Sequence, residues 1–364
     1  MKKDILSYTY GELQDEIAAL GEKPFRAGQV YEWLHVKHVG DFARMSNLSK
    51  ALREKLAGEY DIYTVSPVER RQSKLDGTNK FLFRLHDGNT VESVLMRYKH
   101  GASVCISSQV GCRMGCRFCA STLGGLERNL APSEMLSQVY AVGEIVGERI
   151  SHVVVMGMGE PLDNYDNFVK FVRMLTDGYG LHLSQRNVTV STCGIVPGIL
   201  DLAEENLQIT LALSLHGSTQ EKRRELMPVA NRYELSEVLA ACDAYFEKTG
   251  RRITFEYSLV GGVNDTDEDA RKLIAVARPR NCHVNLIPVN PVRERGFRRP
   301  GKKAALDFRQ KLIRAGVNAT IRREMGTDID GACGQLRQRH GVEAGLSTSC
   351  PDGKAGIQTK KPEF

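Results

Sequence analysis

The sequence predicts an α/β protein with a mainly parallel sheet, preceded by a smaller α+β unit. Three observations lead to this prediction. From residue 103 on, runs rich in β-branched residues alternate with stretches of helical apolar spacing, as in β–α units. Before residue 99, helical patterns come first and a hairpin pattern follows. Glycine or polar residues stand where the predicted strands end, which is where α/β sheets carry their sites.

Residues 1–98 are expected to form the smaller, accessory domain. Helical spacing predicts helices within 10–20 and 25–36, and Ser49 is a suitable N-cap for a third helix. Residues 79–98 alternate in polarity on both sides of the turn sequence "DGN", which predicts a β-hairpin.

Residues 99–340 are expected to form the main domain, with six β–α units. Strands are predicted at 103–108, 152–157, 187–192, 209–216, 253–260 and 283–290, and helices at 133–146, 167–177 and 235–249. Six such units form either an open barrel or a doubly wound sheet, and periodicity does not choose between them. Residues 341–364, rich in Gly, Ser, Thr and Lys, are expected to be a flexible tail in which Cys350 has no function.

Composition limits the location and the partners. No run of about 18 apolar residues is present, so no membrane span is expected. Acidic residues soon follow the two lysines at the start, which argues against a secretory signal and for the cytoplasm. The net charge of +6 permits a nucleic-acid partner. Residues 293–303 carry six basic residues against the single acid Glu294, as either a solvated or a phosphate-contacting loop.

Nine cysteines, an odd number, make a poor disulfide framework. Cys112, Cys116 and Cys119 form a C-x3-C-x2-C motif in a glycine-containing loop that lets three thiolates point inward. Thiolates suit zinc or an iron–sulfur cluster, and three of them leave one iron of a [4Fe–4S] cluster open. A structural zinc site with Cys105 as fourth ligand is the alternative, although Cys105 lies within a predicted strand rather than in a second cysteine pair.

Several motifs in order along the chain resemble a known family. The cysteine motif after the first strand and "MGMGEP" after the second resemble the radical S-adenosylmethionine (SAM) superfamily. Together with Cys105 and Cys333, further segments resemble the RlmN/Cfr family of RNA methyltransferases over about residues 1–340; they are "STCGIVPGI", "LALSLHG", "EYSLVGGVND" and "NLIPVNPV". The resemblance implies a partial (β/α)6 barrel, one [4Fe–4S] cluster on the three cysteines and two SAM molecules per turnover.

The resemblance also implies a chemical route. One SAM methylates Cys333, and a second is cleaved to a radical that takes a hydrogen atom from that methyl group. The resulting methylene radical adds to an adenine carbon, and Glu92 accepts the ring proton. Cys105 then attacks the sulfur of Cys333 and leaves a disulfide that cellular thiols reduce. The alternatives are a surface carboxylate for Glu92 and buried structural thiols for Cys105 and Cys333.

Matching motifs carry the cofactor contacts over from the family. Gly159 and Glu160 are expected at the methionine part of SAM, and Asn290 at its adenine end. The residues expected to line the ribose and the carboxylate are Ser191, Ser214, Leu215 and His216. His216 has the alternative of a core histidine, and Cys193 receives no role although it lies near the site.

Within the family, the substrates implied are 23S rRNA at the peptidyl-transferase centre and position 37 of tRNA, both converted to 2-methyladenosine. Methylation at C8 remains an alternative because both carbons need the same machinery. The N-terminal helices and the 293–303 loop are then expected to contact RNA. An electron donor such as flavodoxin and a monomeric state are also expected. Two further alternatives are a zinc-binding RNA-binding module without catalysis and a radical enzyme acting on protein or small molecules.

Overall fold

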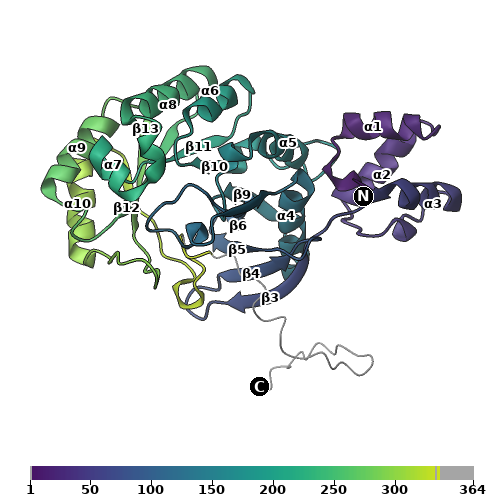
Figure 1. Cartoon of the computed structure of the whole chain (residues 1–364), viewed down its shortest axis with the longest axis horizontal. Coiled ribbons are helices and arrows are strands. Elements are labelled where there is room, and N and C mark those ends of the chain that lie inside the picture. The colour runs from purple at the N-terminus through teal and green to yellow at the C-terminus, as the bar shows by residue number, and fades with distance from the viewer. Residues whose placement is uncertain (1, 333, 337–364) are drawn as a thin grey trace.

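The computed structural model describes residues 2–332 and 334–336, and a ten-stranded sheet runs through it (Figure 1). In spatial order the strands are β14 (Ala319–Ile321), β13 (Cys282–Pro288), β12 (Ile253–Leu259), β11 (Thr210–Ser214), β10 (Val188–Thr192), β9 (Ile150–Val155), β6 (Gly101–Ile106), β5 (Thr90–Tyr98), β4 (Asn79–Arg84) and β3 (Ser66–Gln72). Neighbours from β6 to β14 are parallel, and neighbours from β3 to β6 are antiparallel.

Helices connect the parallel strands and lie along the outer side of the curved sheet (Figure 1). They are α4 (Pro132–Val146), α5 (Tyr165–Leu175), α6 (Val196–Glu204), α7 (Gln220–Leu226), α8 (Leu235–Thr249), α9 (Asp267–Ala277) and α10 (Lys302–Arg314). From β6 to β14 the spatial order follows the chain order, without the reversal that defines a doubly wound sheet. The fold is therefore the open partial barrel.

All six predicted parallel strands form, and β14 adds a seventh at the edge. The predicted hairpin also forms, with Asn79 opposite Leu95 and Arg84 opposite Thr90. However, β5 pairs in turn with β6, so the hairpin extends the barrel sheet. The sheet thus runs across the boundary expected at residue 98.

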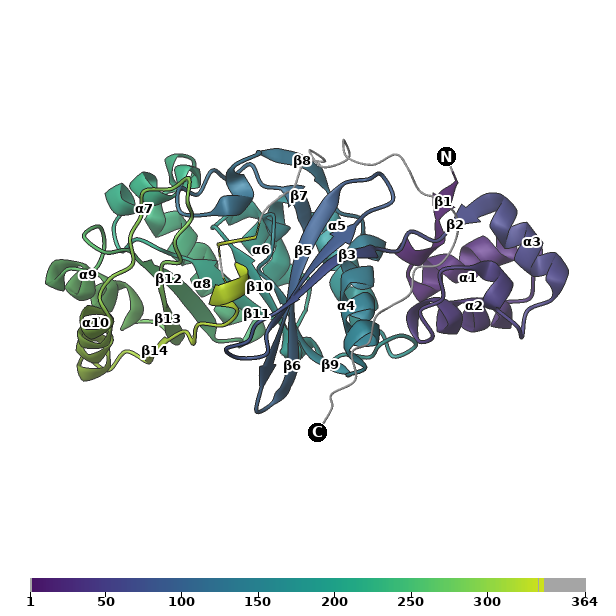
Figure 2. The ribbon, with the colours of Figure 1, turned by 90° about the horizontal axis from the view of Figure 1, so that it is seen from below.

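The first 60 residues have a hydrophobic core of their own, which runs from Ile5 to Tyr60. They form a separate lobe of three helices, α1 (Tyr10–Ala19), α2 (Phe25–His35) and α3 (Lys50–Glu59) (Figure 2). Ser49 caps α3 as predicted by accepting a 3.2 Å hydrogen bond from the Leu52 amide. We call this lobe the N-terminal unit.

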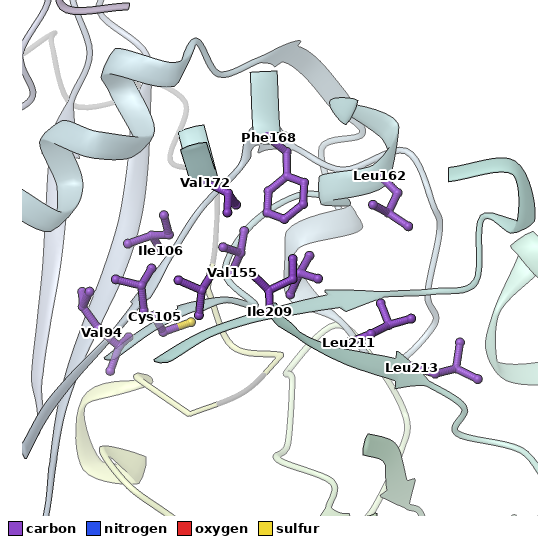
Figure 3. Packing of buried hydrophobic residues seen from close by; sticks show 14 of the residues in the cluster. Val94, Cys105, Ile106, Val155, Leu162, Phe168, Val172, Ile209, Leu211 and Leu213 are labelled. Carbon is purple, nitrogen blue, oxygen red and sulfur yellow. The ribbon is translucent and has the colours of Figure 1, made fainter. Parts of the chain in front are cut away.

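The main core lies between the sheet and its helices. Phe168 and Val172 of α5 are fully buried and point toward Ile106 of β6, Val155 of β9 and Ile209 directly before β11 (Figure 3). Burying a side chain of this size stabilises the fold by about 2–3 kcal/mol. Among the described residues, no helix is both long and apolar enough to cross a membrane.

Candidate active site

One cavity at the carboxyl ends of the strands collects most of the predicted site residues. The predicted residues in its wall are Cys105, Cys112, Cys116, Cys119, Gly159, Glu160, Ser191, Ser214, His216 and Asn290. The side chain of Leu215 belongs to the hydrophobic core instead, and Glu92 is buried beside the wall. Cys333 lies outside the described residues, whereas its neighbours Ala332 and Gly334 line the cavity.

The three-cysteine loop follows β7 (Gln109–Gly111). Its shape is held from within, because the Thr122 hydroxyl lies 3.1 Å from both the Cys116 and the Cys119 carbonyl oxygens. The Cys112 amide donates a 2.7 Å hydrogen bond to the Gly125 carbonyl oxygen. Gly115 has φ +71°, a left-handed conformation that glycine adopts without strain. The loop therefore presents all three thiols to the cavity.

The surroundings of these thiols fit a metal cluster. Burial raises the pKa of Cys112 to about 12, and burial together with the neighbouring thiols raises the pKa of Cys116 well above its usual value. A bound metal cation lowers the pKa of these thiols instead, because metal binding displaces their protons. Among the described residues, no three His, Cys, Asp or Glu side chains converge as ligands of one ion. In an iron–sulfur cluster each thiolate binds a different iron, so the thiols do not have to converge on one ion. Three thiols on one loop therefore fit the ligation of such a cluster.

The "MGMGE" turn after β9 is packed tightly against β6 and β7. A Cβ atom on Gly157 would lie 2.5 Å from the Ile106 carbonyl oxygen, and one on Gly159 would lie 2.7 Å from Cβ of Gln109. Gly159 also has φ +104°, which L side chains rarely adopt. The two glycines thus allow the turn to approach neighbouring backbone, and this approach positions Glu160.

Glu160 links the ends of β9 and β10. Its carboxylate accepts hydrogen bonds from the backbone amides of Cys193 (2.7 Å) and Leu162 (3.1 Å). Burial raises the pKa of Glu160, and the hydrogen bonds from Cys193, Thr192 and Leu162 oppose that shift. The carboxylate oxygens keep further acceptor capacity, which an ammonium group in the cavity can use.

Ser191 and Ser214 lie side by side at the ends of β10 and β11, with their hydroxyl oxygens 3.1 Å apart. Next to them stands Glu256, which pairs in register with Ser214 and lines the cavity. Its carboxylate accepts a 2.9 Å hydrogen bond from Asn285 and lies 3.9 Å from Arg322. The sequence analysis missed Glu256, although an acidic residue within an apolar strand run was a usable signal.

His216 is buried in the cavity wall. Its Nδ1 accepts a 2.9 Å hydrogen bond from the Ser258 amide, which leaves the ring proton on Nε2. Burial, helped by the positive charge of Arg223, lowers the pKa of His216 to about 3. The ring is therefore a neutral donor, and it packs edge-to-face on Phe118 with ring centroids 4.7 Å apart.

Arg223 of α7 is a fully buried arginine that the sequence analysis also missed. It donates hydrogen bonds to the carbonyl oxygens of Ser214 (3.1 Å), Leu215 (2.9 Å) and Cys193 (3.0 Å). Leu215 thus contributes to the site through its backbone. By tying these carbonyls together, Arg223 fixes the ends of β10 and β11 relative to each other.

Glu92 on β5 is fully buried, so the surface-carboxylate alternative is wrong. Its Oε2 lies 2.9 Å from Nζ of Lys80 on β4. Cys105 stands opposite Val94 in the register of β5 and β6, and the two lie side by side in Figure 3. Since Glu92 and Val94 are two residues apart on one strand, Glu92 and Cys105 share a face of the sheet.

Residues 324–332 and 334–336, which we call the closing segment, dock on the turn between β3 and β4 and on the cysteine loop. At that turn, the Gly326 amide donates a 2.9 Å hydrogen bond to Asp76. At the cysteine loop, the Ala120 amide donates to the Gly334 carbonyl (2.8 Å), and the Ser121 hydroxyl donates to the Leu336 carbonyl (2.8 Å). The closing segment therefore completes the cavity wall.

The basic loop 293–303 is only partly available for phosphates. Arg295 donates a 2.9 Å hydrogen bond to Thr122 beside the cysteine loop, and Arg299 forms an ion pair with Glu324 of the closing segment. Arg293 and Arg298 are exposed. The loop thus combines structural and surface cations, a division that its composition did not predict.

Two family models match the chain: the ribosomal RNA large subunit methyltransferase N-terminal domain over residues 3–62, and the radical SAM superfamily over residues 106–274. A protein of Lachnoclostridium phytofermentans named "Probable dual-specificity RNA methyltransferase RlmN" is 60% identical, covering 93% of this chain and 95% of its own. The chain belongs to the RlmN family. A relative of the same name from Clostridium perfringens is 52% identical, covering 94% of this chain and 99% of its own.

A solved structure agrees with the fold. The crystal structure of a radical SAM methyltransferase from Sphaerobacter thermophilus is 42% identical, with a TM-score of 0.88, and covers 92% of this chain and 99% of that one. The RlmN N-terminal model coincides with the N-terminal unit, and the radical SAM model includes the cysteine loop and β9 to β12. Membership brings a [4Fe–4S] cluster and SAM as cofactors, as the resemblance implied, in place of structural zinc.

Proposed function

We propose that this RlmN-family chain methylates adenine C2 in 23S rRNA and at position 37 of tRNA. The name shared by its relatives, dual-specificity RNA methyltransferase, supports this proposal. The observation that carries it is one cavity that joins the three-cysteine loop, the strand-end residues and both neighbours of Cys333. A non-catalytic RNA-binding module has no need for that combination.

We propose that Cys112, Cys116 and Cys119 hold the cluster, which together with SAM supplies a methyl group and a radical. The neutral Nε2–H of His216 and the paired hydroxyls of Ser191 and Ser214 are suited to donate hydrogen bonds to the ribose and the carboxylate of SAM. The remaining proposed SAM contacts are Gly159, Glu160, Asn290 and the backbone of Leu215.

The proposed roles of Cys333, Glu92 and Cys105 follow one another. Cys333 loses one hydrogen atom from its methyl group to the SAM-derived radical and delivers the methylene that remains to C2 of the adenine, and Glu92 accepts the proton lost from C2. The thiolate of Cys105 then attacks the sulfur of Cys333: a sulfur–sulfur bond forms as the bond between that sulfur and the transferred carbon breaks. The released carbon takes up a proton to complete the methyl group, and the one surplus electron would return to the cluster. Glu92 and Cys105 lie on the same face of the sheet, so both side chains can act on one bound adenine. This placement supports the proposed sequence of steps.

We propose that RNA approaches the cavity over the exposed arginines of the 293–303 loop and the N-terminal unit, with the target adenine flipped out of its stack. Each phosphate contact made by these residues adds to the salt dependence of binding. An electron donor such as flavodoxin, a cytoplasmic location and a monomeric state complete the proposal.

The first experiment is anaerobic purification followed by iron, sulfide and zinc analysis and mass spectrometry of the Cys333 peptide. We expect about four irons per chain and a methyl group on Cys333. One zinc and an unmodified Cys333 would remove both the cluster and the methyl carrier.

The second experiment supplies the purified protein with SAM, a reductant and either a 23S rRNA fragment or tRNA. Nucleosides are then released from the RNA and separated, so that 2-methyladenosine and 8-methyladenosine are distinguished. We expect 2-methyladenosine from both RNAs. Formation of 8-methyladenosine would show that the chain methylates C8 and not C2. Methylation of one RNA alone would contradict dual specificity.

A further inference from the structure

Lys80 is a lysine inside the sheet, with only 4% of the residue exposed. Its ammonium lies 2.9 Å from Oε2 of Glu92 and donates a 3.0 Å hydrogen bond to the main-chain carbonyl of Asp330. Burying an ammonium is costly unless it is paired and hydrogen-bonded. These two contacts therefore account for a lysine at this place.

The strand register places Lys80 on the face of the sheet that borders the cavity. Lys80 is directly opposite Val94, and Val94 is directly opposite Cys105. Opposite residues share a face, and so do residues two apart, which adds Glu92 to the same face. Because Val94 and Cys105 line the cavity, the Lys80–Glu92 pair stands next to its wall.

The second partner of Lys80 belongs to the closing segment. Asp330 has φ +52°, an uncommon conformation for a residue other than glycine. The turn around it is fixed by a 2.8 Å hydrogen bond from the Gly331 amide to the Gly326 carbonyl and by a 3.0 Å hydrogen bond from the Lys74 amide to Asp328. The Asp330 carbonyl is thus held toward β4, three residues before Cys333.

A buried ion pair can serve stability alone, but this one includes the carboxylate to which we assign the proton of adenine C2. We propose that Lys80 is a positioning residue that directs the Glu92 carboxylate toward the adenine, while the Asp330 carbonyl fixes Lys80. The inference rests on the proposed function. The C2 proton passes to Glu92, and Lys80 keeps its own protons throughout.

The test measures single-turnover methylation of RNA whose target adenine carries hydrogen or deuterium at C2. Wild type, Lys80→Met and Lys80→Arg are used, each with cluster content and Cys333 methylation measured first. Lys99→Met is the matched control, an exposed lysine in the turn between β5 and β6. We expect Lys80→Met to slow methylation about 100-fold, as misplaced catalytic groups do. We expect Lys80→Arg to lose less because it keeps the cation, and Lys99→Met to match wild type.

The isotope effect separates positioning from folding. If Lys80 positions the proton acceptor, Lys80→Met slows the proton transfer itself, and the deuterium effect on methylation becomes larger than in wild type. A variant that merely folds less well contains fewer active molecules with an unchanged isotope effect. That second result, with Cys333 fully methylated, would overturn the proposal.

A double variant keeps the test valid if Lys80→Met alone is too unstable. Lys80→Met with Glu92→Gln removes both charges, so no unpaired charge stays buried. If Lys80 acts only through Glu92, this protein methylates RNA at the rate of Glu92→Gln alone. A further slowing would show a separate structural role and overturn the inference. Failure of the proposed function would instead appear in wild type, as a methylated Cys333 without RNA product.

Discussion

A single buried side chain, Arg223, organises the ends of two strands. It reaches three carbonyl oxygens from one planar guanidinium, an arrangement that the point charge of lysine cannot reproduce. We expect Arg223→Lys to lower the free energy of unfolding by about 2–4 kcal/mol, because buried hydrogen bonds to a charged group are lost. Urea denaturation of the protein without cluster measures this.

The exposed neighbour Arg224, whose partner is Glu234 at the surface, supplies the control for that experiment. Arg224→Lys should change the unfolding free energy by less than about 0.5 kcal/mol, since surface ion pairs contribute little. Equal losses from the two substitutions would mean that the three carbonyl contacts do not stabilise the fold.

Gly157 and Gly159 illustrate what single residues reveal before a structure is known. The "MGMGE" motif predicted a contact of Gly159 with SAM, and the structure adds a close approach of both glycines to Ile106 and Gln109. Gly157→Ala places a Cβ 2.5 Å from a backbone oxygen, so the turn must shift. We expect at least a tenfold weaker SAM affinity, measured by equilibrium dialysis, while Gly178→Ala, where a Cβ meets nothing within 4 Å, should leave the affinity unchanged.

At the scale of elements, the positions of strands were easier to predict than the contacts that loop residues make. Six parallel strands were found because each combines β-branched residues with a polar or glycine end, whereas the three residues of β14 offer too short a pattern. The basic loop was recognised by composition. Its division into structural and exposed arginines depends on Thr122 and Glu324, which are distant in sequence and close only in the fold.

The exposed arginines of the basic loop give a prediction for RNA binding. Replacing Arg293 and Arg298 with Ala should reduce the slope of log affinity against log salt by about 1.4, or about 0.7 for each lost phosphate contact. Arg299 is left intact because its loss would break the ion pair with Glu324. Filter binding at several salt concentrations measures the slope.

Two exposed arginines on the outer helical layer, Arg271 and Arg278, provide an equal change of charge as the control. The slope should stay at the wild-type value when both are replaced with Ala. If the two double variants lower it equally, net charge rather than the loop determines binding.

At the scale of the whole molecule, the N-terminal unit docks on the barrel through the buried His35 and the half-buried His38. His35 of α2 lies 3.0 Å from the hydroxyl of Tyr140 on α4, and the ring of His38 stacks on Tyr140 at 4.0 Å. Burial lowers the pKa of His35 to about 3, so His35 is neutral in the folded protein at neutral pH. Between about pH 6.5 and pH 3 the unfolded chain binds the proton more readily, and stability falls as the pH falls.

We therefore expect acid to destabilise the protein partly through His35. Between pH 7 and pH 5.5 this residue should account for about 1 kcal/mol of lost unfolding free energy, and His35→Gln should reduce the loss by that amount. His182→Asn, at an exposed histidine, should leave the pH dependence unchanged. Urea unfolding at both pH values measures the difference, and an unchanged pH dependence in His35→Gln would show that His35 is protonated within the fold.

Much of the fold and of the candidate site could be predicted from the sequence, and the features that could not be predicted share one cause. The barrel, the cysteine loop and the strand-end residues depend on local patterns and on the order of motifs. The Lys80–Glu92 pair, the carbonyl contacts of Arg223 and the continuation of the hairpin into the barrel sheet depend on register between distant segments. A one-residue shift in register would turn Lys80 to the other face, and composition does not record that choice.

The docking of the closing segment has a consequence for biosynthesis. Because Ala120 and Ser121, directly after the last cysteine of the cluster motif, bond to Gly334 and Leu336, the cavity wall needs residues that the ribosome adds late. A nascent chain that already contains all three cysteines therefore keeps that side of the cavity open until about residue 336 has emerged. Until Gly334 and Leu336 dock, we expect iron and sulfide to reach the thiols from that side of the cavity.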